Sequence, residues 1–363
     1  FIITAFLTSV FAWLTLTSVF AWLTRVLPEN ISIVINNPNL LGYQEQLIAV
    51  FGNPAYFAAF LLFAVGFCFL VIERRFFKPR IINSLLLLLA GFFTLTLIFT
   101  QIRGAYVALA AGVFLFCFLV ILFLRRKSKK LAILSAAVLF IGIISIGSLF
   151  ALKETEFVKS RHVLKRTTEV ADFWQSDSIR ERLLNWSIAL KAFKEKPVFG
   201  YGPENYGAAS NRYYDYRVGR NEPWFDRAHN QAMDTLATGG IVVFSAYLFL
   251  LISAAFLIFK ISKENKLLSF ILASLLLAYF LQGFFLFDTL AVFLGLFPFL
   301  AYLVYQNTEP RTQNPDKAQI TNYKVQIPIL VGVAAFSLFL IYTTAVLPRR
   351  ANEAAFKFLI YSD

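Results

Sequence analysis

A group of polar residues stands directly ahead of a long apolar run in EPWFDRAHNQAMDTLATGG, residues 222–240. His229 is one of two histidines in the chain, and Asp226, Arg227 and Asn230 lie beside it. A helix that begins near Asn230 would point its positive end at the imidazole, and this end and Arg227 both disfavour a protonated ring. A neutral histidine can accept a proton from an attacking hydroxyl group, with Asp226 orienting the ring. The alternative is a histidine that only caps the helix or lies at a membrane surface.

Two arginines in SIRERLLNWSIALKAF, residues 178–193, are candidates for binding an anionic group. The spacing of the apolar residues predicts an amphipathic helix on the membrane surface, with Arg182 and Trp186 as neighbours on one face. The apolar stripe comprises Ile179, Leu183, Trp186, Leu190 and Phe193. A guanidinium fork matches a pair of phosphate oxygens, so Arg182, together with Arg180, could hold a phosphate group of a ligand. The alternative is an interfacial anchor whose arginines meet lipid phosphates.

A further arginine, Arg103, separates two apolar runs in TQIRGAY. Gly104 permits a tight turn there. An arginine next to hydrocarbon is costly unless it reaches the surface or is paired, so a snorkelling side chain is one interpretation and a ligand-binding side chain is the other. Asp288 is predicted on the same side of the membrane and could pair with one of the arginines.

The segment between residues 196 and 230 combines turn residues with exposed aromatic candidates. Gly200, Gly202 and Gly207 allow tight turns. Tyr201, the other tyrosines of the segment and Trp224 offer flat faces that suit either a sugar ring or the aromatic belt of a membrane interface. Composition leaves both interpretations open.

These residues must be positioned by membrane helices. The chain of 363 residues is 58% hydrophobic and 15% charged, whereas a soluble domain is roughly 45–50% apolar and about 25% charged. Long apolar runs therefore predict an all-α, polytopic integral membrane protein with about nine transmembrane helices. The predicted spans are 1–24, 54–72, 82–101, 104–124, 131–152, 230–259, 267–286, 288–305 and 326–346.

Basic residues orient these spans. Lys and Arg gather in the loops after the second, fourth, sixth and eighth spans, which the positive-inside rule places in the cytoplasm. The predicted organisation is N-terminal helices over 1–152, one large extracytoplasmic loop over 153–229, C-terminal helices over 230–346 and an outward tail over 347–363. Residues 153–228 hold 14 Lys and Arg against 11 Asp and Glu. Much of the net charge of +13 therefore lies in cytoplasmic loops, which argues against a nucleic-acid partner.

The cysteines and histidines do not form a metal-binding pattern. Cys68 and Cys117 lie inside apolar runs, where a free cysteine behaves as a small hydrophobic residue. The sequence contains no CxxC motif and no cluster of His and Cys. We therefore expect neither a disulfide nor a structural zinc site.

Taken in order, these motifs resemble those of the O-antigen ligase and O-antigen polymerase family. The resemblance runs from about residue 51 to residue 297 and rests on the order and spacing of four short motifs. These are Arg103-Gly104 between two spans, Arg182 and Trp186 in the loop, Pro197 with Gly200 and Gly202, and His229-Asn230 ahead of Gly239-Gly240. The tail 347–363 resembles the start of a tetratricopeptide-like region. Members of the family usually have more spans, so the sequence is expected to be a fragment.

The resemblance implies glycosyl transfer on the outer side of the bacterial cytoplasmic membrane. The donor would be a glycan on an undecaprenyl pyrophosphate carrier, the acceptor a hydroxyl group of a glycan, lipid or protein, and neither a metal nor another cofactor would take part. The implied catalytic residues are His229, Arg182 and Arg103. The implied binding residues are Arg180, Arg227, Asp226, Asn230, Trp186 and Tyr201.

Three other functions remain alternatives. A protein O-oligosaccharyltransferase has similar chemistry and a different acceptor. A flippase or other transporter of lipid-linked oligosaccharides would keep ionisable groups near the bilayer midplane, whereas the predicted spans are nearly free of them. A non-catalytic scaffold would explain the spans but not the Arg and His residues on one side.

Overall fold

The structure is a computed structural model that describes residues 53–74, 79–160, 162–168, 177–215 and 224–308, together with the isolated residues 2, 9 and 47. Throughout these described ranges the regular structure is helical, with no strand. The membrane-type helices are α4 (Pro54–Glu73), α5 (Arg80–Phe99), α6 (Arg103–Leu124), α7 (Lys129–Ala151), α12 (Gln231–Ser262), α13 (Lys266–Gln282) and α14 (Leu290–Thr308). Shorter or amphipathic helices lie between α7 and α12, namely α8 (Glu156–Lys159), α9 (His162–Thr168), α10 (Asp177–Glu195) and α11 (Tyr206–Arg212).

Seven of the nine predicted spans fall on these helices. Six of the seven are long and apolar enough to cross a membrane, and α13 is a shorter apolar helix of 17 residues. The all-helical membrane architecture is therefore confirmed for the described part of the chain. The predicted spans 1–24 and 326–346 and the tail 347–363 lie outside the described residues, so the total of nine stays a prediction.

Local sequence explains where several helices begin. The side-chain oxygens of Asn53, Ser128, Asn230 and Asn265 each accept a hydrogen bond from a backbone N–H in the first turn of α4, α7, α12 and α13, respectively. A capping side chain satisfies one of the four N–H groups that have no partner within the helix. Polar residues between apolar runs therefore mark the helix starts.

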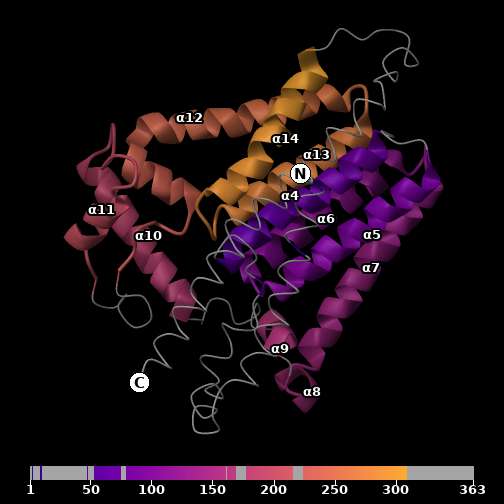
Figure 1. The fold of residues 1–363 in the computed structure, drawn as a ribbon, viewed down its shortest axis with the longest axis horizontal. Helices are drawn as coiled ribbons and strands as arrows, with labels where there is room; N and C mark the ends of the chain where they lie inside the picture. Colours follow the sequence, from indigo (N-terminus) through magenta and orange to yellow (C-terminus); the bar gives the residue numbers. More distant parts are fainter. Residues whose placement is uncertain are drawn as a thin grey trace, which may run out of the picture.

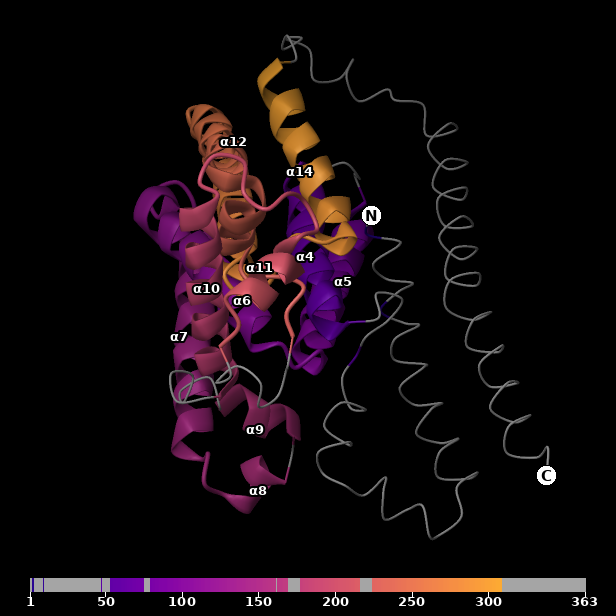
Figure 2. The ribbon, with the colours of Figure 1, turned by 90° about the vertical axis from the view of Figure 1, so that its left-hand side faces the viewer.

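Helix α4 lies at the centre of the bundle and α7 at its edge. Most of the apolar window of α4 is buried inside the protein (61%), whereas only 6% of that of α7 is. Phe57, Phe60 and Phe63 of α4 are among the largest fully buried side chains. Figure 2 shows α8 and α9 at one end of the bundle and the C-terminal end of α14 at the opposite end. This agrees with the predicted placement of the loops after the fifth and the eighth spans on opposite sides of the membrane.

Helix α12 is broken at Gly240, whereas the sequence predicted one continuous span over 230–259. Gly240 has φ 62° and ψ −162°, which divides α12 into a first part over 231–239 and a second part over 241–262. In an unbroken helix the N–H groups of Ile241 and Val242 would bond to the carbonyls of Ala237 and Thr238. Figure 1 shows the bend, with α10 and α11 beside it.

Residues 197–202 insert into this break and replace the lost hydrogen bonds. The N–H groups of Ile241 and Val242 donate to the carbonyls of Pro197 (2.8 Å) and Val198 (3.4 Å). The freed carbonyls of α12 in turn accept from Tyr201 N (2.9 Å) and Gly202 N (2.8 Å). Two helical bonds are thus exchanged for four bonds to another segment, which ties the segment after α10 to α12. The continuous hydropathy of α12 conceals this break.

The predicted amphipathic helix 178–193 is confirmed as α10, but only part of the predicted stripe is buried. Ile179 is 5% exposed, whereas Leu183 and Leu190 are 46% and 42% exposed. Ala189 and Ala192, outside the stripe, are fully buried. These alanines pack with Ala237 of α12 in one hydrophobic cluster. Small side chains let the two helices approach closely, so α10 packs on α12 through these alanines and leaves Leu183 and Leu190 outside.

Candidate functional site

His229 directly precedes the cap of α12 in an uncommon backbone conformation. Its φ is 52°, in the left-handed region that residues other than glycine rarely adopt. Asn230 accepts a hydrogen bond from Met233 N at 3.1 Å and is buried. The predicted helix start is therefore confirmed within one residue, and the amide of Asn230 serves as the cap.

The imidazole of His229 lies between two phenylalanine rings. The ring of Phe225 stands edge-on at 5.5 Å between centroids, and that of Phe287 is tilted at 5.8 Å. The pKa of His229 is lowered to about 4, mainly by burial and also by the charge of Arg182, while the charge of Asp226 opposes the shift. The sequence predicted a neutral ring but attributed it to the helix end and Arg227, whereas burial and Arg182 account for it. His229 is accordingly neutral near pH 7.

The loop between α13 and α14, residues 283–289, contacts Arg182 and His229 and packs next to Arg103. The guanidinium Cζ of Arg182 lies 5.9 Å from the centroid of the Phe285 ring. A Cβ added at Gly104 would lie only 2.7 Å from the Cβ of Phe285, so this phenylalanine packs directly on the residue after Arg103. Because Phe287 of the same loop lies against His229, one short segment contacts the surroundings of Arg103, Arg182 and His229.

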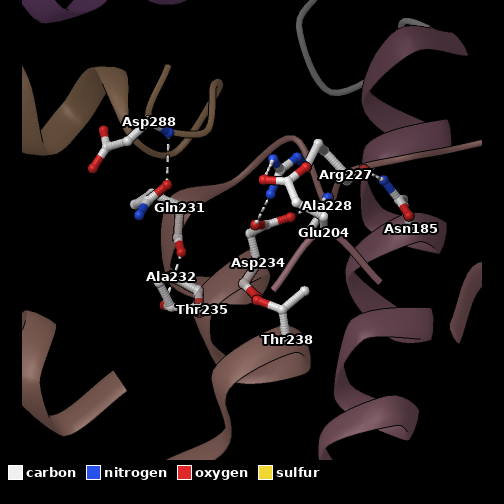
Figure 3. Close-up of polar contacts among 10 residues, drawn as sticks. All are labelled: Asn185, Glu204, Arg227, Ala228, Gln231, Ala232, Asp234, Thr235, Thr238 and Asp288. Atoms are coloured by element: carbon white, nitrogen blue, oxygen red, sulfur yellow. Dashed lines mark hydrogen bonds and ion pairs between the residues drawn. The ribbon is translucent and has the colours of Figure 1, made fainter. Parts of the chain in front are cut away.

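Hydrogen bonds to α12 hold this loop in place. Gln231 N donates to the carbonyl of Gly283 (2.7 Å). Asp288 N donates to Oε1 of Gln231 (2.7 Å), as Figure 3 shows. The hydroxyl of Tyr279 donates to Oδ2 of Asp288 (2.8 Å), where the sequence had suggested an arginine partner. Burial raises the pKa of Asp288 to about 6, although the bond from Tyr279 lowers it. The loop is thus fixed to the first residue of α12.

Arg227 has two carboxylate partners within the protein. It forms an ion pair with Glu204, and its Nη1 lies 3.3 Å from Oδ2 of Asp234 (Figure 3). Its guanidinium also lies 5.2 Å from the centroid of the Phe287 ring. These contacts give Arg227 a structural role next to His229. The carboxylates of Glu204 and Asp234 balance the positive charge of Arg227, which the predicted role would have used to bind a ligand.

Two buried residues outside the predicted set, Asn185 and Asp234, hold the segment before His229. Asn185 donates from Nδ2 to the carbonyl of Arg227 (2.9 Å), and Asp234 accepts a hydrogen bond from Ala228 N (2.9 Å). The hydroxyl of Tyr206 donates to Oδ1 of Asn185. The sequence held a signal for Asp234, because an acidic residue in the first turn of a helix is favoured by the helix dipole. Asn185 gave no such signal.

The remaining predicted site residues occupy different surroundings. Arg180 and Asp226 are exposed, and Asp226 acts on His229 through its charge. Trp186 is partly buried, with its Nε1 buried and without a hydrogen-bond partner. The hydroxyl of Tyr201 donates to Glu195 (2.6 Å), and the Tyr201 ring lies under the ammonium of Lys196. Tyr201 therefore belongs to a surface cluster with Glu195.

Metal-binding groups do not gather in the described part of the chain. Among those residues no three His, Cys, Asp or Glu side chains are close enough to hold an ion together. Cys68 and Cys117 are both buried and free. A metal-independent mechanism stays a prediction.

Comparison with known proteins identifies the family that this region resembles. The family model described as O-Antigen ligase matches residues 88–248, a stretch that includes Arg103, Arg182 and His229. The resemblance predicted from the sequence is confirmed over these residues. An uncharacterized protein of Haemophilus influenzae is 22% identical over 236 residues, which are 62% of this chain and 56% of that protein. The chain thus spans about half the length of this relative.

Proposed function

We propose that this integral membrane protein, with an O-antigen ligase domain over residues 88–248, transfers a glycan from an undecaprenyl pyrophosphate carrier to an acceptor hydroxyl group on the outer side of the bacterial cytoplasmic membrane. The observation that carries the proposal is the meeting of Arg182 and a neutral His229 at the α13–α14 loop. Arg182 is close enough to lower the pKa of His229, and both side chains lie against phenylalanines of that loop.

The proposed reaction is a displacement at the anomeric carbon of the donor sugar. The acceptor oxygen forms a bond to this carbon, and the bond from the carbon to the pyrophosphate oxygen breaks. The electron pair stays on the pyrophosphate, and the proton of the acceptor hydroxyl passes to His229. A neutral imidazole is required for this last transfer, and burial keeps the ring neutral.

Arginine charge stabilises the leaving group in this proposal. Negative charge develops on the pyrophosphate as the glycosidic bond breaks, and donors aimed at that position lower the barrier. Arg182 is assigned to this role, with Arg103 as a second cation. The bound pyrophosphate also offsets the effect of Arg182 on His229, so the histidine becomes a stronger base once the donor has bound. Transfer on this scheme uses no metal and no nucleotide sugar.

The test is a transfer assay with the full-length protein in lipid nanodiscs. The donor is a synthetic undecaprenyl-pyrophosphate glycan, and three acceptors are compared, namely a glycolipid, a soluble oligosaccharide and a peptide with hydroxyl side chains. The variants are His229→Ala, Arg182→Ala and Arg103→Ala. The control is Arg126→Ala, which removes an exposed cation from the α6–α7 loop.

The expected result is product with at least one acceptor, at a rate that falls about 10²-fold or more in the three site variants and stays near wild type in the control. His229→Ala should retain donor binding, measured by a fluorescent donor, while Arg182→Ala should weaken it. Normal transfer in all three site variants would refute the site. Movement of the intact donor across the membrane without transfer would favour a transporter.

A further inference from the structure

The peptide bond between Arg227 and Ala228 is held from both sides. Its carbonyl accepts a hydrogen bond from Nδ2 of Asn185 (2.9 Å), and its N–H donates to Oδ1 of Asp234 (2.9 Å) (Figure 3). Asn185 comes from α10 and Asp234 from the first turn of α12. Two helices that are far apart in the sequence therefore fix the plane of one peptide unit just before His229.

Both clamping residues are buried and make further hydrogen bonds. Asn185 is fully buried, and its Oδ1 accepts the hydroxyl of Tyr206, which is also fully buried. Asp234 is 6% exposed, and its own N–H donates to the carbonyl of Asn230 (2.8 Å), as the first turn of α12 requires. A buried peptide group without these partners would lose roughly 1–3 kcal/mol, so the clamp is favoured over a relaxed arrangement.

His229 needs such a clamp because of its backbone conformation. A φ of 52° is unfavourable for a residue with a side chain, and conformations of this kind cost about 1–3 kcal/mol unless their surroundings enforce them. The cap at Asn230 holds the segment on the C-terminal side of His229, and the clamped peptide holds it on the N-terminal side. These two fixed ends set the direction of the Cα–Cβ bond of His229, and the rings of Phe225 and Phe287 then restrict the imidazole.

We propose that Asn185 and Asp234 are positioning residues that aim the His229 ring at the acceptor hydroxyl by clamping the Arg227–Ala228 peptide. The assignment of a hydroxyl to the ring rests on the proposed function, whereas the clamp itself does not. The ion pair of Arg227 with Glu204 is not part of the clamp, because Glu204 contacts the guanidinium and not the peptide.

Chemical modification of His229 tests the clamp without any substrate. The chain has two histidines, so a His162→Gln background leaves His229 as the only histidine that diethyl pyrocarbonate, which reacts with neutral imidazole, can modify. Asn185→Ala and Asp234→Ala should react several-fold faster than the background protein, since the ring is released from between Phe225 and Phe287. Asp234→Asn keeps an oxygen acceptor and nearly the same volume, so it should react at an intermediate rate.

The matched control is Glu204→Gln, which removes one ion pair of Arg227 and leaves both peptide contacts intact. It should be modified at the background rate. Equal rates in Asp234→Asn, Asn185→Ala and Glu204→Gln would overturn the clamp. Thermal unfolding of each variant identifies global destabilisation. The modification rates are compared at a temperature below the unfolding range of every variant.

The transfer assay then tests whether the clamp affects the rate of glycan transfer. Asp234→Asn should lower kcat about 10-fold or more, with the KM of the donor nearly unchanged, because a misdirected base slows the reaction and leaves donor binding intact. A raised donor KM with normal kcat would contradict the positioning role. If wild type transfers no glycan but the modification rates follow the clamp, the proposed function fails and the clamp stands.

Discussion

At the scale of single residues, the environment of His229 makes the stability of the protein depend on pH. An unfolded histidine titrates near pH 6.5, and the pKa of His229 in the structure is about 4, because burial and then Arg182 disfavour the charged ring. Between these values the unfolded chain binds a proton that the folded chain does not. The contribution of His229 to stability is therefore complete above about pH 6.5 and is lost as the pH falls towards about 4.

We predict that this contribution disappears in His229→Gln. The measurement is thermal unfolding in detergent between about pH 7.5 and pH 4.5, where wild type should lose stability more steeply than the variant. The same slope in both proteins would mean that the ring titrates as in the unfolded chain.

The rate of transfer should also fall at acidic pH, once His229 becomes protonated. Because the proposed base is already neutral above its pKa, we expect kcat/KM to be level from about pH 8 down to about pH 5 and to fall below that. Arg182→Gln removes one of the causes that lower the pKa of His229, so its acid limb should move to higher pH. An acid limb near pH 6.5 in wild type would contradict a buried His229.

The residue types of the site could be read from the sequence, but their partners could not. Arg227 illustrates the limit. Its proximity to His229 suggested a ligand-binding cation, whereas Glu204 and Asp234 balance its charge in the folded protein. Glu204 is 23 residues away in the chain, and no local pattern identifies such a partner.

At the scale of elements, the break in α12 connects the segment after α10 to the helix that carries the site. A Cβ at Gly240 would lie 2.3 Å from the carbonyl oxygen of Val198, and its φ of 62° is unfavourable for alanine. A Cβ at Gly200 would in turn lie 2.5 Å from the carbonyl carbon of Thr238, so Gly200 and Gly240 each allow the backbone of the other segment to approach.

We predict that Gly240→Ala destabilises the protein by about 1–3 kcal/mol and lowers its yield in membranes. The matched control is Gly142→Ala in α7, where an added Cβ meets nothing within 4 Å. An exposed helical glycine replaced by alanine should be neutral or stabilising by about 0.5–1 kcal/mol. Thermal unfolding of both variants measures this difference. Equal stability of the two would refute the docking of residues 197–202 into the break.

At the scale of the whole molecule, the proposed function requires the site to lie on the outer side of the membrane. Lys127, in the α6–α7 loop, belongs to the predicted cytoplasmic side, and Glu154, just after α7, belongs to the predicted outer side. Both side chains are exposed, and both native cysteines are buried. Single cysteines at these positions can therefore report sidedness.

We predict that Glu154→Cys is labelled by a membrane-impermeant maleimide in intact cells. Lys127→Cys should be labelled only after the cells are permeabilised. The opposite pattern would place the α7–α12 segment in the cytoplasm and would rule out a donor in the outer leaflet. Labelling of the parent protein measures the background from Cys68 and Cys117.

The sequence by itself determined the helical membrane architecture and the order of the site residues along it. Apolar runs of about 20 residues must form helices in a bilayer, because no water is present there to satisfy the backbone. The helix starts at Asn53, Asn230 and Asn265 also depend on local sequence, because each cap bonds to a backbone N–H two or three residues later. Seven spans and the amphipathic helix could therefore be predicted from composition and spacing.

Only the tertiary structure decided which surfaces and charges meet. Ala189 and Ala192 of α10 are buried because α12 offers Ala237 as a matching surface, although Leu183 and Leu190 are more hydrophobic. The neutrality of His229 depends on Arg182 and on burial between Phe225 and Phe287, and its direction on Asn185 and Asp234. These contacts join segments that are distant in the chain, and their energies depend on burial, which exists only once the helices have packed.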